Sequence, residues 1–278
     1  MTLDSSAANP LTLDIPQGAA LISLRAVNLV YASGRRSLTA LHNVNLDLHP
    51  EDFVCVIGPS GCGKSSLLRV IAGYERPSQG YITVAGKPHT KPNAEVGVVF
   101  QQPNLFPWLT VAQNVDFSPR MQGLSQTIRQ NKIEHYLQMV GLIRAANLFP
   151  HELSGGMKQR VAIARSLAAD PKVILMDEPF AALDALTREA MQDYLRQIWR
   201  TTQKTILFIT HDVEEALLLA TRIVVMYANP GRIVKDIENP FARRLEHTSA
   251  TELRSSREFL ELRQELVSSI KEAHLANV

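Results

Sequence analysis

The chain has 278 residues, 45% of them hydrophobic, so it can bury a substantial core in one large domain or in one domain with a subdomain. That composition excludes a disordered or fibrous protein. The net charge is +2 and the basic residues are scattered, which gives no electrostatic argument for a nucleic-acid partner.

Cysteine usage and the N-terminus indicate the compartment. Cys55 lies in a strand-like run and Cys62 in a turn, so no disulfide is expected and a reducing compartment is indicated. Residues 1–19 are predicted to form a flexible tail, and they lack the basic and apolar regions of a signal peptide. The apolar residues 217–228 are interrupted by Thr221 and Arg222, and no run approaches the roughly 18 residues of a membrane helix. The chain is therefore expected to stay in the cytoplasm and to reach a membrane only through a partner.

The first structured part of the chain is predicted to be a β subdomain. Residues 21–31 and 40–48 alternate between apolar and polar side chains, which predicts antiparallel strands joined by a turn at residues 33–36. A short apolar run at residues 52–57 is of strand type, and residues 66–72 have helical composition.

Between that run and that helix, residues 58–65 fit the pattern G-x-x-x-x-G-K-[ST], and we call them the phosphate loop. Glycines let such a loop wrap around phosphates, while successive N–H groups and the helix dipole face the anion. Lys64 is expected to reach the β- and γ-phosphates, and the Ser65 hydroxyl to ligate Mg²⁺. The nucleotide-binding residues predicted here are Gly58, Pro59, Ser60, Gly61, Cys62, Gly63, Lys64, Ser65 and Ser66.

After two further predicted strands, at residues 81–85 and 96–100, the character of the sequence changes. Residues 101–171 show helical spacing, with Ile133, Leu137 and Val140 on one face, which predicts a helical insertion.

Strand character returns at residues 172–176, 205–210 and 223–227, with helices between. This alternation is typical of a parallel α/β sheet, in which ligands lie at the carboxyl ends of the strands. The tail from residue 239 contains a predicted helix whose apolar face is expected to cover its own domain rather than bind a partner. That face consists of Phe259, Leu262, Leu266 and Ile270.

The strand at residues 172–176 runs into two carboxylates, Asp177 and Glu178. Beside a phosphate loop, Asp177 is expected to hold the Mg²⁺ shell through water and Glu178 to polarise the attacking water. The alternative is a strand that simply ends in an acidic, solvated loop.

A second anion site is predicted at residues 153–160, where Ser154 is a good N-cap and Gly155 and Gly156 leave helix N–H groups exposed. This motif resembles the signature of ATP-binding-cassette ATPases, and the resemblance extends over residues 21–237. In that family the signature of one subunit binds the γ-phosphate held by the phosphate loop of another. The resemblance therefore implies a head-to-tail dimer, most simply of two copies of this chain, with two ATP molecules between the subunits.

The resemblance also assigns residues one at a time. Tyr31 matches the ring that stacks on adenine, and His211 the histidine that contacts the γ-phosphate. Gln101 matches the glutamine that reaches Mg²⁺ and the attacking water and senses the transporter, with Gln102 beside it as an alternative. Asp184 belongs to the loop that crosses the dimer interface.

One position departs from the family. The commonest signature has Gln where this chain has Met157, so a side-chain hydrogen bond is lost and altered geometry, but not inactivity, is expected. The implied fold is an α/β P-loop ATPase core with a mixed or parallel sheet at residues 20–238. It carries an N-terminal antiparallel β subdomain, an inserted helical subdomain at about residues 102–171 and a helical extension at residues 239–278.

Other nucleotide-dependent classes fit less well. A GTPase would need Asn-Lys-x-Asp, whereas residues 131–134 end in Glu within a helical pattern, and a kinase has no use for the signature. The coiled coils of repair machines and the paired cassettes of translation factors are missing from the sequence, although a soluble cassette ATPase outside transport stays the alternative. A single cassette resembles a bacterial importer subunit at the cytoplasmic face of the inner membrane, bound to a separate permease and served indirectly by a secreted solute-binding protein.

The solute is indicated only by resemblance. Four segments look like the nitrate, sulfonate and taurine importer group, and the Phe-Ala-Arg-Arg in the last favours taurine or another alkanesulfonate over nitrate or another small anion. The apolar, proline-stiffened residues 103–109 suit a groove for a permease helix, with burial against the chain's own core as the alternative. The four segments are residues 98–101, 105–108, 177–184 and 240–244.

Overall fold

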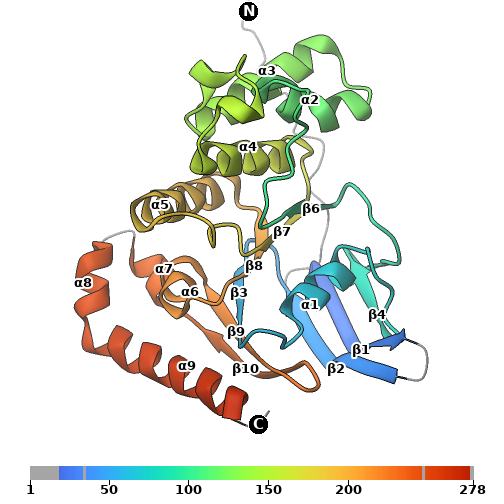
Figure 1. Ribbon diagram of the computed structural model, residues 1–278, viewed down its shortest axis with the longest axis vertical. Helices are drawn as coiled ribbons and strands as arrows, with labels where there is room; N and C mark the ends of the chain where they lie inside the picture. Colours follow the sequence, from blue (N-terminus) through green and yellow to red (C-terminus); the bar gives the residue numbers. More distant parts are fainter. Residues whose placement is uncertain (1–18, 34–35, 246–247, 276–278) are drawn as a thin grey trace, which may run out of the picture.

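The computed structural model describes residues 19–33, 36–245 and 248–275 (Figure 1). The tail predicted at residues 1–19 lies outside them except for its last residue. Two sheets and three groups of helices make up the described part.

The smaller sheet is antiparallel, with the strand order β2-β1-β4-β5. Strand β1 pairs with β2 on one side and β4 on the other, so Ile22 lies opposite both Leu48 and Val84, and all three side chains are buried. The predicted antiparallel pair is confirmed, although residues 34–35 of its turn lie outside the described residues. The strands are β1 (Ile22–Ser33), β2 (Arg36–Leu48), β4 (Gln79–Val84) and β5 (Lys87–Pro88).

The larger sheet has the order β10-β9-β3-β8-β7-β6, in which all neighbours are parallel except β10 and β9. The predicted parallel sheet is confirmed. Strand β10 was not predicted, because its alternating exposed and half-buried residues lack the apolar run that marks the other strands. The strands are β3 (Phe53–Ile57), β6 (Val96–Val99), β7 (Val173–Asp177), β8 (Thr205–Ile209), β9 (Arg222–Tyr227) and β10 (Arg232–Glu238).

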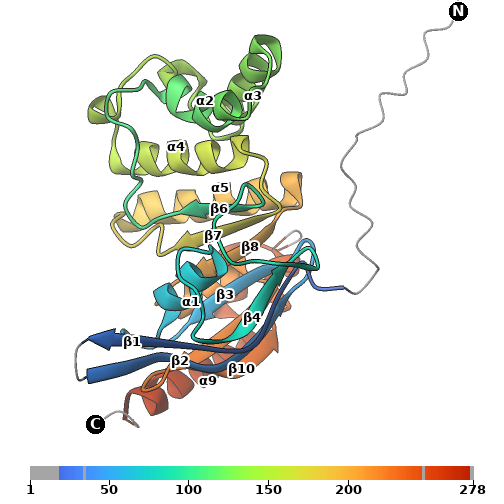
Figure 2. The same ribbon diagram turned by 90° about the vertical axis from the view of Figure 1, so that its right-hand side faces the viewer.

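Both faces of the large sheet are covered, which explains why its strands are continuous apolar runs. Along β3, Phe53 and Cys55 point into one apolar cluster and Val54 and Val56 into another, because successive side chains of a strand alternate. Figures 1 and 2 show the small sheet and α1 (Lys64–Ile71) on one side, and α5 (Ala185–Thr202) and α6 (Val213–Leu219) on the other. Both cysteines are buried and free, as expected.

The helical insertion stands at one end of the molecule, at the top of Figure 1. Each of its helices begins at a side-chain cap: Thr110 accepts from the backbone N–H of Gln113, Ser125 from that of Ile128 and Ser154 from that of Met157. It consists of α2 (Val111–Met121), α3 (Gln126–Met139), α4 (Gly155–Ala168) and two 3-10 turns, Ile143–Ala145 and Pro150–Glu152.

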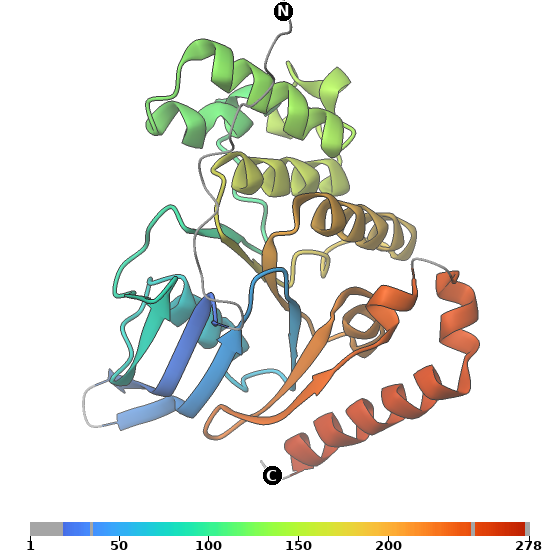
Figure 3. The same ribbon diagram turned by 180° about the vertical axis from the view of Figure 1, so that it is seen from behind.

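The C-terminal helices are α7 (Phe241–Arg244), α8 (Ala250–Ser255) and α9 (Arg257–Leu275), and Figure 3 shows α9 lying along the end of the large sheet. The predicted apolar face of α9 packs on the chain's own core, with Phe259 and Leu266 buried and Leu262 and Ile270 partly buried. Among the described residues no helix is both long enough and apolar enough to span a membrane.

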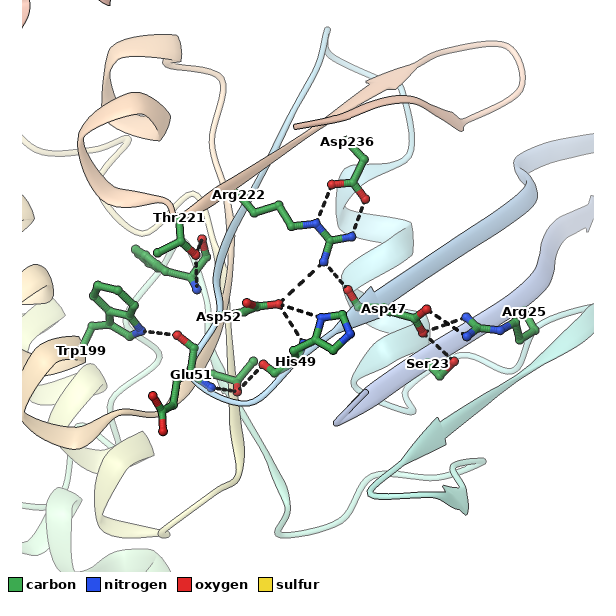
Figure 4. Close-up of polar contacts among 12 residues, drawn as sticks. Ser23, Arg25, Asp47, His49, Glu51, Asp52, Trp199, Thr221, Arg222 and Asp236 are labelled. Atoms are coloured by element: carbon green, nitrogen blue, oxygen red, sulfur yellow. Dashed lines mark hydrogen bonds and ion pairs between the residues drawn. The ribbon is translucent and has the colours of Figure 1, made fainter. Parts of the chain in front are cut away.

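A polar junction at the amino ends of the parallel strands joins the two sheets (Figure 4). Arg222, at the start of β9, donates to both carboxylate oxygens of Asp236 and to the Asp47 backbone oxygen. It also lies 3.7 Å from the Asp52 carboxylate. The Asp47 carboxylate accepts two further bonds, of 2.8 and 2.9 Å, from Arg25. We call Arg25, Asp47, Asp52, Arg222 and Asp236 the amino-end junction.

Candidate active site

The phosphate loop connects β3 to α1 at the carboxyl end of the sheet. Lys64, at the start of α1, is 7% exposed, and its Nζ donates to the backbone oxygens of Gly58 at 2.8 Å and Pro59 at 3.1 Å. Gly63 has φ +94°, and a Cβ there would lie 2.8 Å from the Ala40 oxygen, so no larger residue fits. The loop thus curls around the ammonium group of Lys64, and part of the loop lines a cavity.

That cavity has a volume of about 330 Å³. Tyr31, at the end of β1, lies at its mouth with its side chain 38% exposed. The Tyr31 hydroxyl donates to Glu75 and lies 3.4 Å from Ser66, so the ring is held against the phosphate loop from the small sheet. The residues predicted from the loop and its surroundings that line the cavity are Tyr31, Ser60, Gly61, Gly63, Lys64, Ser65, Ser66 and Glu178.

Two oxygen donors meet beside the loop. The Ser65 hydroxyl lies 3.3 Å from Oδ1 of Asp177, the last residue of β7. Burial raises the pKa of Asp177, the neighbouring Glu178 charge adds to the rise, and Ser65 opposes it. A hydroxyl and a carboxylate are the hard oxygen ligands that Mg²⁺ prefers, and a cation here would relieve the cost of burying the carboxylate. The residues present therefore fit a magnesium ion.

Glu178 and His211 come together from adjacent strands. Glu178 follows β7, and its backbone N–H donates to the oxygen of Ile209, the last residue of β8, at 3.0 Å. This bond brings Glu178 beside the turn that carries His211. Oε2 of Glu178 lies 3.1 Å from Nδ1 of His211. Glu178 has φ +43°, a left-handed conformation that costs free energy in a residue with a side chain and is frequent at functional sites.

Gln101 is exposed and follows β6 after Phe100. The oxygen of Phe100 accepts a hydrogen bond of 3.3 Å from Gln159, a residue of α4 that is only 2% exposed. The position of Gln101 is therefore tied to the helix that carries the signature. Sequence reasoning missed Gln159, although its polar side chain on the buried face of a helix was a usable signal.

The signature lies at the start of α4, in the helical insertion, and neither Ser154 nor Gly156 is among the residues that line the cavity of the phosphate loop. Ser154 and Gly155 are exposed. A Cβ on Gly156 would lie 2.7 Å from Cγ2 of Thr187, because the first turn of α5 packs against the signature. The structure therefore keeps the two predicted anion sites of one chain apart.

The remaining predicted positions surround the signature. Asp184 is exposed and caps α5, since it accepts from the Thr187 N–H at 3.0 Å and from the Thr187 hydroxyl at 2.7 Å. The N–H bond from Thr187, followed by the hydroxyl bond, lowers the pKa of Asp184. Met157 is half-buried and packs against the apolar core. Where the commonest family signature has a polar Gln, this chain therefore has an apolar side chain that packs on the core.

Glu75 and Thr187 are the partners that the sequence did not reveal. Glu75 bonds Tyr31 and Thr187 packs against Gly156, and in both cases the two residues lie in different elements, so no local sequence pattern encodes the contact. The bond between Asp184 and Thr187 could have been predicted, because the two residues have the spacing of a helix cap.

A phosphate loop at a strand end, paired oxygen donors and a Glu–His pair at the next strand ends define the class of P-loop nucleotide hydrolases. Comparison with known proteins narrows this class. Residues 41–181 match the family described as ABC transporter.

Two relatives from bacteria are close to the chain. The nitrate import ATP-binding protein NrtD of Synechocystis sp. is 51% identical over 216 residues, which are 78% of this chain and 81% of that protein. The taurine import ATP-binding protein TauB of Jannaschia sp. is 47% identical over 234 residues, 84% of this chain and 87% of that protein.

A solved structure agrees. The dimeric, post-hydrolysis ATP-binding cassette MJ0796 bound to ADP and Pi has a TM-score of 0.69 and 34% identity, and the match covers 78% of this chain and 98% of that one. The chain belongs to the ATP-binding-cassette transporter family. It is an ABC transporter ATPase with the predicted cassette fold, so the resemblance seen in the sequence is confirmed.

Proposed function

We propose that this chain is the ATPase subunit of an importer for small anions, and that two copies enclose two ATP molecules and act on a separate permease. The observation that carries the proposal is the division of the site. Five residues lie at the carboxyl end of the large sheet, whereas the signature stands apart on the helical insertion. The five are Lys64, Ser65, Asp177, Glu178 and His211.

The residues at and around the carboxyl end of the large sheet have distinct roles in this proposal. Lys64 exchanges its bonds to the loop backbone for the β- and γ-phosphates, and Tyr31 stacks on the adenine. Ser65, Asp177 and Gln101 would hold Mg²⁺, Asp177 through water, and the ion would supply positive charge against the phosphates. Glu178 accepts a proton from the attacking water, and His211, 3.1 Å away, orients Glu178 and contacts the γ-phosphate.

The dimer follows from the isolation of the signature. Ser154 and Gly155 are exposed at the positive end of α4, but in their own chain they do not line the cavity of the phosphate loop. A second copy placed head to tail brings its signature to this loop, and Asp184 beside the signature then lies at the subunit boundary. The dimeric cassette MJ0796 supports this arrangement.

A second surface suits the permease. A groove of about 510 Å³ runs between β6 and the helical insertion, lined in part by Phe100, Phe106, Phe117 and Met121. Met121 is 73% exposed, and Trp108, packed against Phe106, is 70% exposed. Exposed apolar patches of this kind mark protein interfaces. Residues 103–109 are thus partly buried, as at Leu105, and partly available, and a permease helix in the groove would hold the chain at the cytoplasmic face of the inner membrane.

The solute is a small oxyanion or sulfonate. Nitrate and taurine relatives match this chain about equally well, and the Phe-Ala-Arg-Arg segment at residues 241–244 favours taurine or an alkanesulfonate. Neighbouring genes for a permease and a secreted binding protein test the importer assignment, and calorimetric titration of that binding protein with taurine, alkanesulfonates and nitrate names the solute.

Copurification tests the docking surface. Met121→Asp should abolish copurification with the permease and leave ATP hydrolysis by the isolated subunit unchanged, because a charge in the groove cannot be desolvated cheaply. Leu260→Asp, on the half-exposed outer side of α9, is the matched control and should copurify normally. Normal permease binding by Met121→Asp would reject the groove, and hydrolysis without any permease partner would favour a cassette ATPase outside transport.

A further inference from the structure

Glu215, the third residue of α6, is a buried carboxylic acid that the mechanism above does not use. Its side chain is 5% exposed, and burial of an ionisable group is costly unless partners satisfy it. One carboxyl oxygen accepts a hydrogen bond of 3.0 Å from the amide of Gln192 on α5, which is itself 7% exposed. Two buried polar side chains therefore join α6 to α5.

Glu215 also borders the turn that carries His211. Thr210, His211 and Asp212 line one small cavity together with Glu215. The Thr210 hydroxyl oxygen accepts from the backbone N–H of Asp212 at 3.0 Å. The bond from Thr210 to Asp212 spans His211 and fixes its backbone.

The same carboxyl faces the reacting groups across a small cavity. The cavity has a volume of about 20 Å³, and Glu178, His211, Arg188 and Glu215 are among its lining residues. Arg188 of α5 donates to the Leu183 oxygen at 2.8 Å, so it holds the loop between Glu178 and α5. Burial raises the pKa of Glu215, while the side chains of Thr210 and Gln192 oppose the rise.

We propose that Glu215 is a positioning residue for His211. It locks the turn at residues 210–212 and ties it through Gln192 to α5, the helix that Asp184 begins. This inference rests on the proposed function, which gives His211 its role in hydrolysis.

Steady-state kinetics of the full chain tests the positioning role. Glu215→Ala should lower kcat for ATP about ten- to a hundredfold, because small displacements of reacting groups have effects of that size. The KM should stay within about twofold, since the contacts of the phosphate loop are untouched. Glu215→Gln keeps the shape and an acceptor for Gln192 and should recover most of the loss.

A neighbouring glutamate provides the matched control. Glu214 lies on the same helix but pairs with Arg263 of α9, at 2.7 Å, and Glu214→Ala should leave kcat unchanged. Gln192→Leu should lower kcat less than Glu215→Ala, and the double variant should be no slower than Glu215→Ala alone. Additive losses would contradict a shared link.

A readout without catalysis separates this inference from the proposed function. In the nucleotide-free protein, the imidazole signals of His211 in a ¹H–¹³C spectrum should shift in Glu215→Ala and stay in place in Glu214→Ala. Unchanged His211 signals, with kcat lost only in proportion to thermal stability, would overturn the inference. Shifted signals in a protein whose His211→Ala variant hydrolyses ATP normally would support the link and reject only the role of His211.

Discussion

The amino end and the carboxyl end of the large sheet are built in opposite ways. At the amino end, Arg222 bonds Asp236 and the Asp47 backbone and lies beside Asp52, so the charged groups of the junction satisfy one another (Figure 4). At the carboxyl end, Ser65 reaches Asp177 only at 3.3 Å. Such a long hydrogen bond contributes little to stability. The amino end therefore serves the fold, whereas the carboxyl end is arranged for a ligand.

The largest effect that distinguishes the carboxyl end from the amino end should come from Glu178→Gln. Loss of the base should lower kcat by about a hundred- to ten-thousandfold, while ATP binding persists because a glutamine keeps the size of the side chain. Single-turnover hydrolysis and ATP titration measure the two effects, and gel filtration with ATP should show a trapped dimer. Normal turnover in this variant would reject Glu178 as the base.

A smaller effect is expected at Tyr31, which lines the same cavity from the small sheet. Tyr31→Ala should weaken ATP binding by about 1–2 kcal/mol through lost stacking, without abolishing hydrolysis at saturating nucleotide. Tyr31→Phe keeps the ring and loses only the bonds to Glu75 and Ser66, so its ATP dissociation constant should stay near that of the unmodified chain. Equal weakening in both variants would mean that the hydroxyl, and not the ring, binds.

At the amino end the same size of change should appear in stability instead. Arg222→Met should lower the free energy of unfolding by about 2 kcal/mol, because it leaves the carboxylates of Asp236 and Asp52 without their charged donor. The kcat for ATP should not change. Arg257→Met is the matched control, since Arg257 is 91% exposed and pairs along α9 with Glu261, and its cost should stay below about 0.5 kcal/mol.

Urea titrations followed by circular dichroism, with ATPase assays on the same samples, check this contrast. If Arg222→Met lowers kcat as strongly as Glu178→Gln while the protein stays folded, the amino and carboxyl ends of the sheet are not independent.

The carboxyl end was predictable from the sequence because its chemistry is written in contiguous motifs. Residues 58–65 directly follow β3, and Asp177 ends β7 with Glu178 directly after it. The end of an apolar strand therefore marks the ligand side of the sheet. The parallel strands were found for the same reason, since burial on both faces gives continuous apolar runs.

The amino-end junction was not predictable, because its charges come from distant segments. Arg25 and Asp47 are 22 residues apart on neighbouring strands, and Arg222 and Asp236 are 14 apart across the hairpin of β9 and β10. Only the register of strand pairing brings them together. Strand β10 was missed for a related reason, since half of its residues face solvent. The link from Glu215 to Gln192 likewise joins two helices that are adjacent only in the folded chain.

The smallest effect concerns acid stability at the amino end. Burial alone would raise the pKa of Asp47, but the bonds from Arg25 and Ser23 outweigh it, so this pKa lies below its usual value. A lowered pKa means that Asp47 stabilises the fold above about pH 4 and that this contribution is lost as the pH falls through the lowered value. Because Arg25 is 42% exposed, the contribution should not exceed about 1 kcal/mol.

Asp47→Asn should therefore be less stable than the unmodified chain at pH 7, and the difference should shrink as the pH falls below about 4 and the wild-type carboxyl takes up its proton. Urea unfolding at stepped pH values measures this difference. Asp170→Asn is the matched control, because the Asp170 carboxyl, 46% exposed, pairs at 2.7 Å with Lys204 away from the junction. A difference that stays constant with pH would show that the geometry of the Asp47 bonds, and not their charge, joins the two sheets.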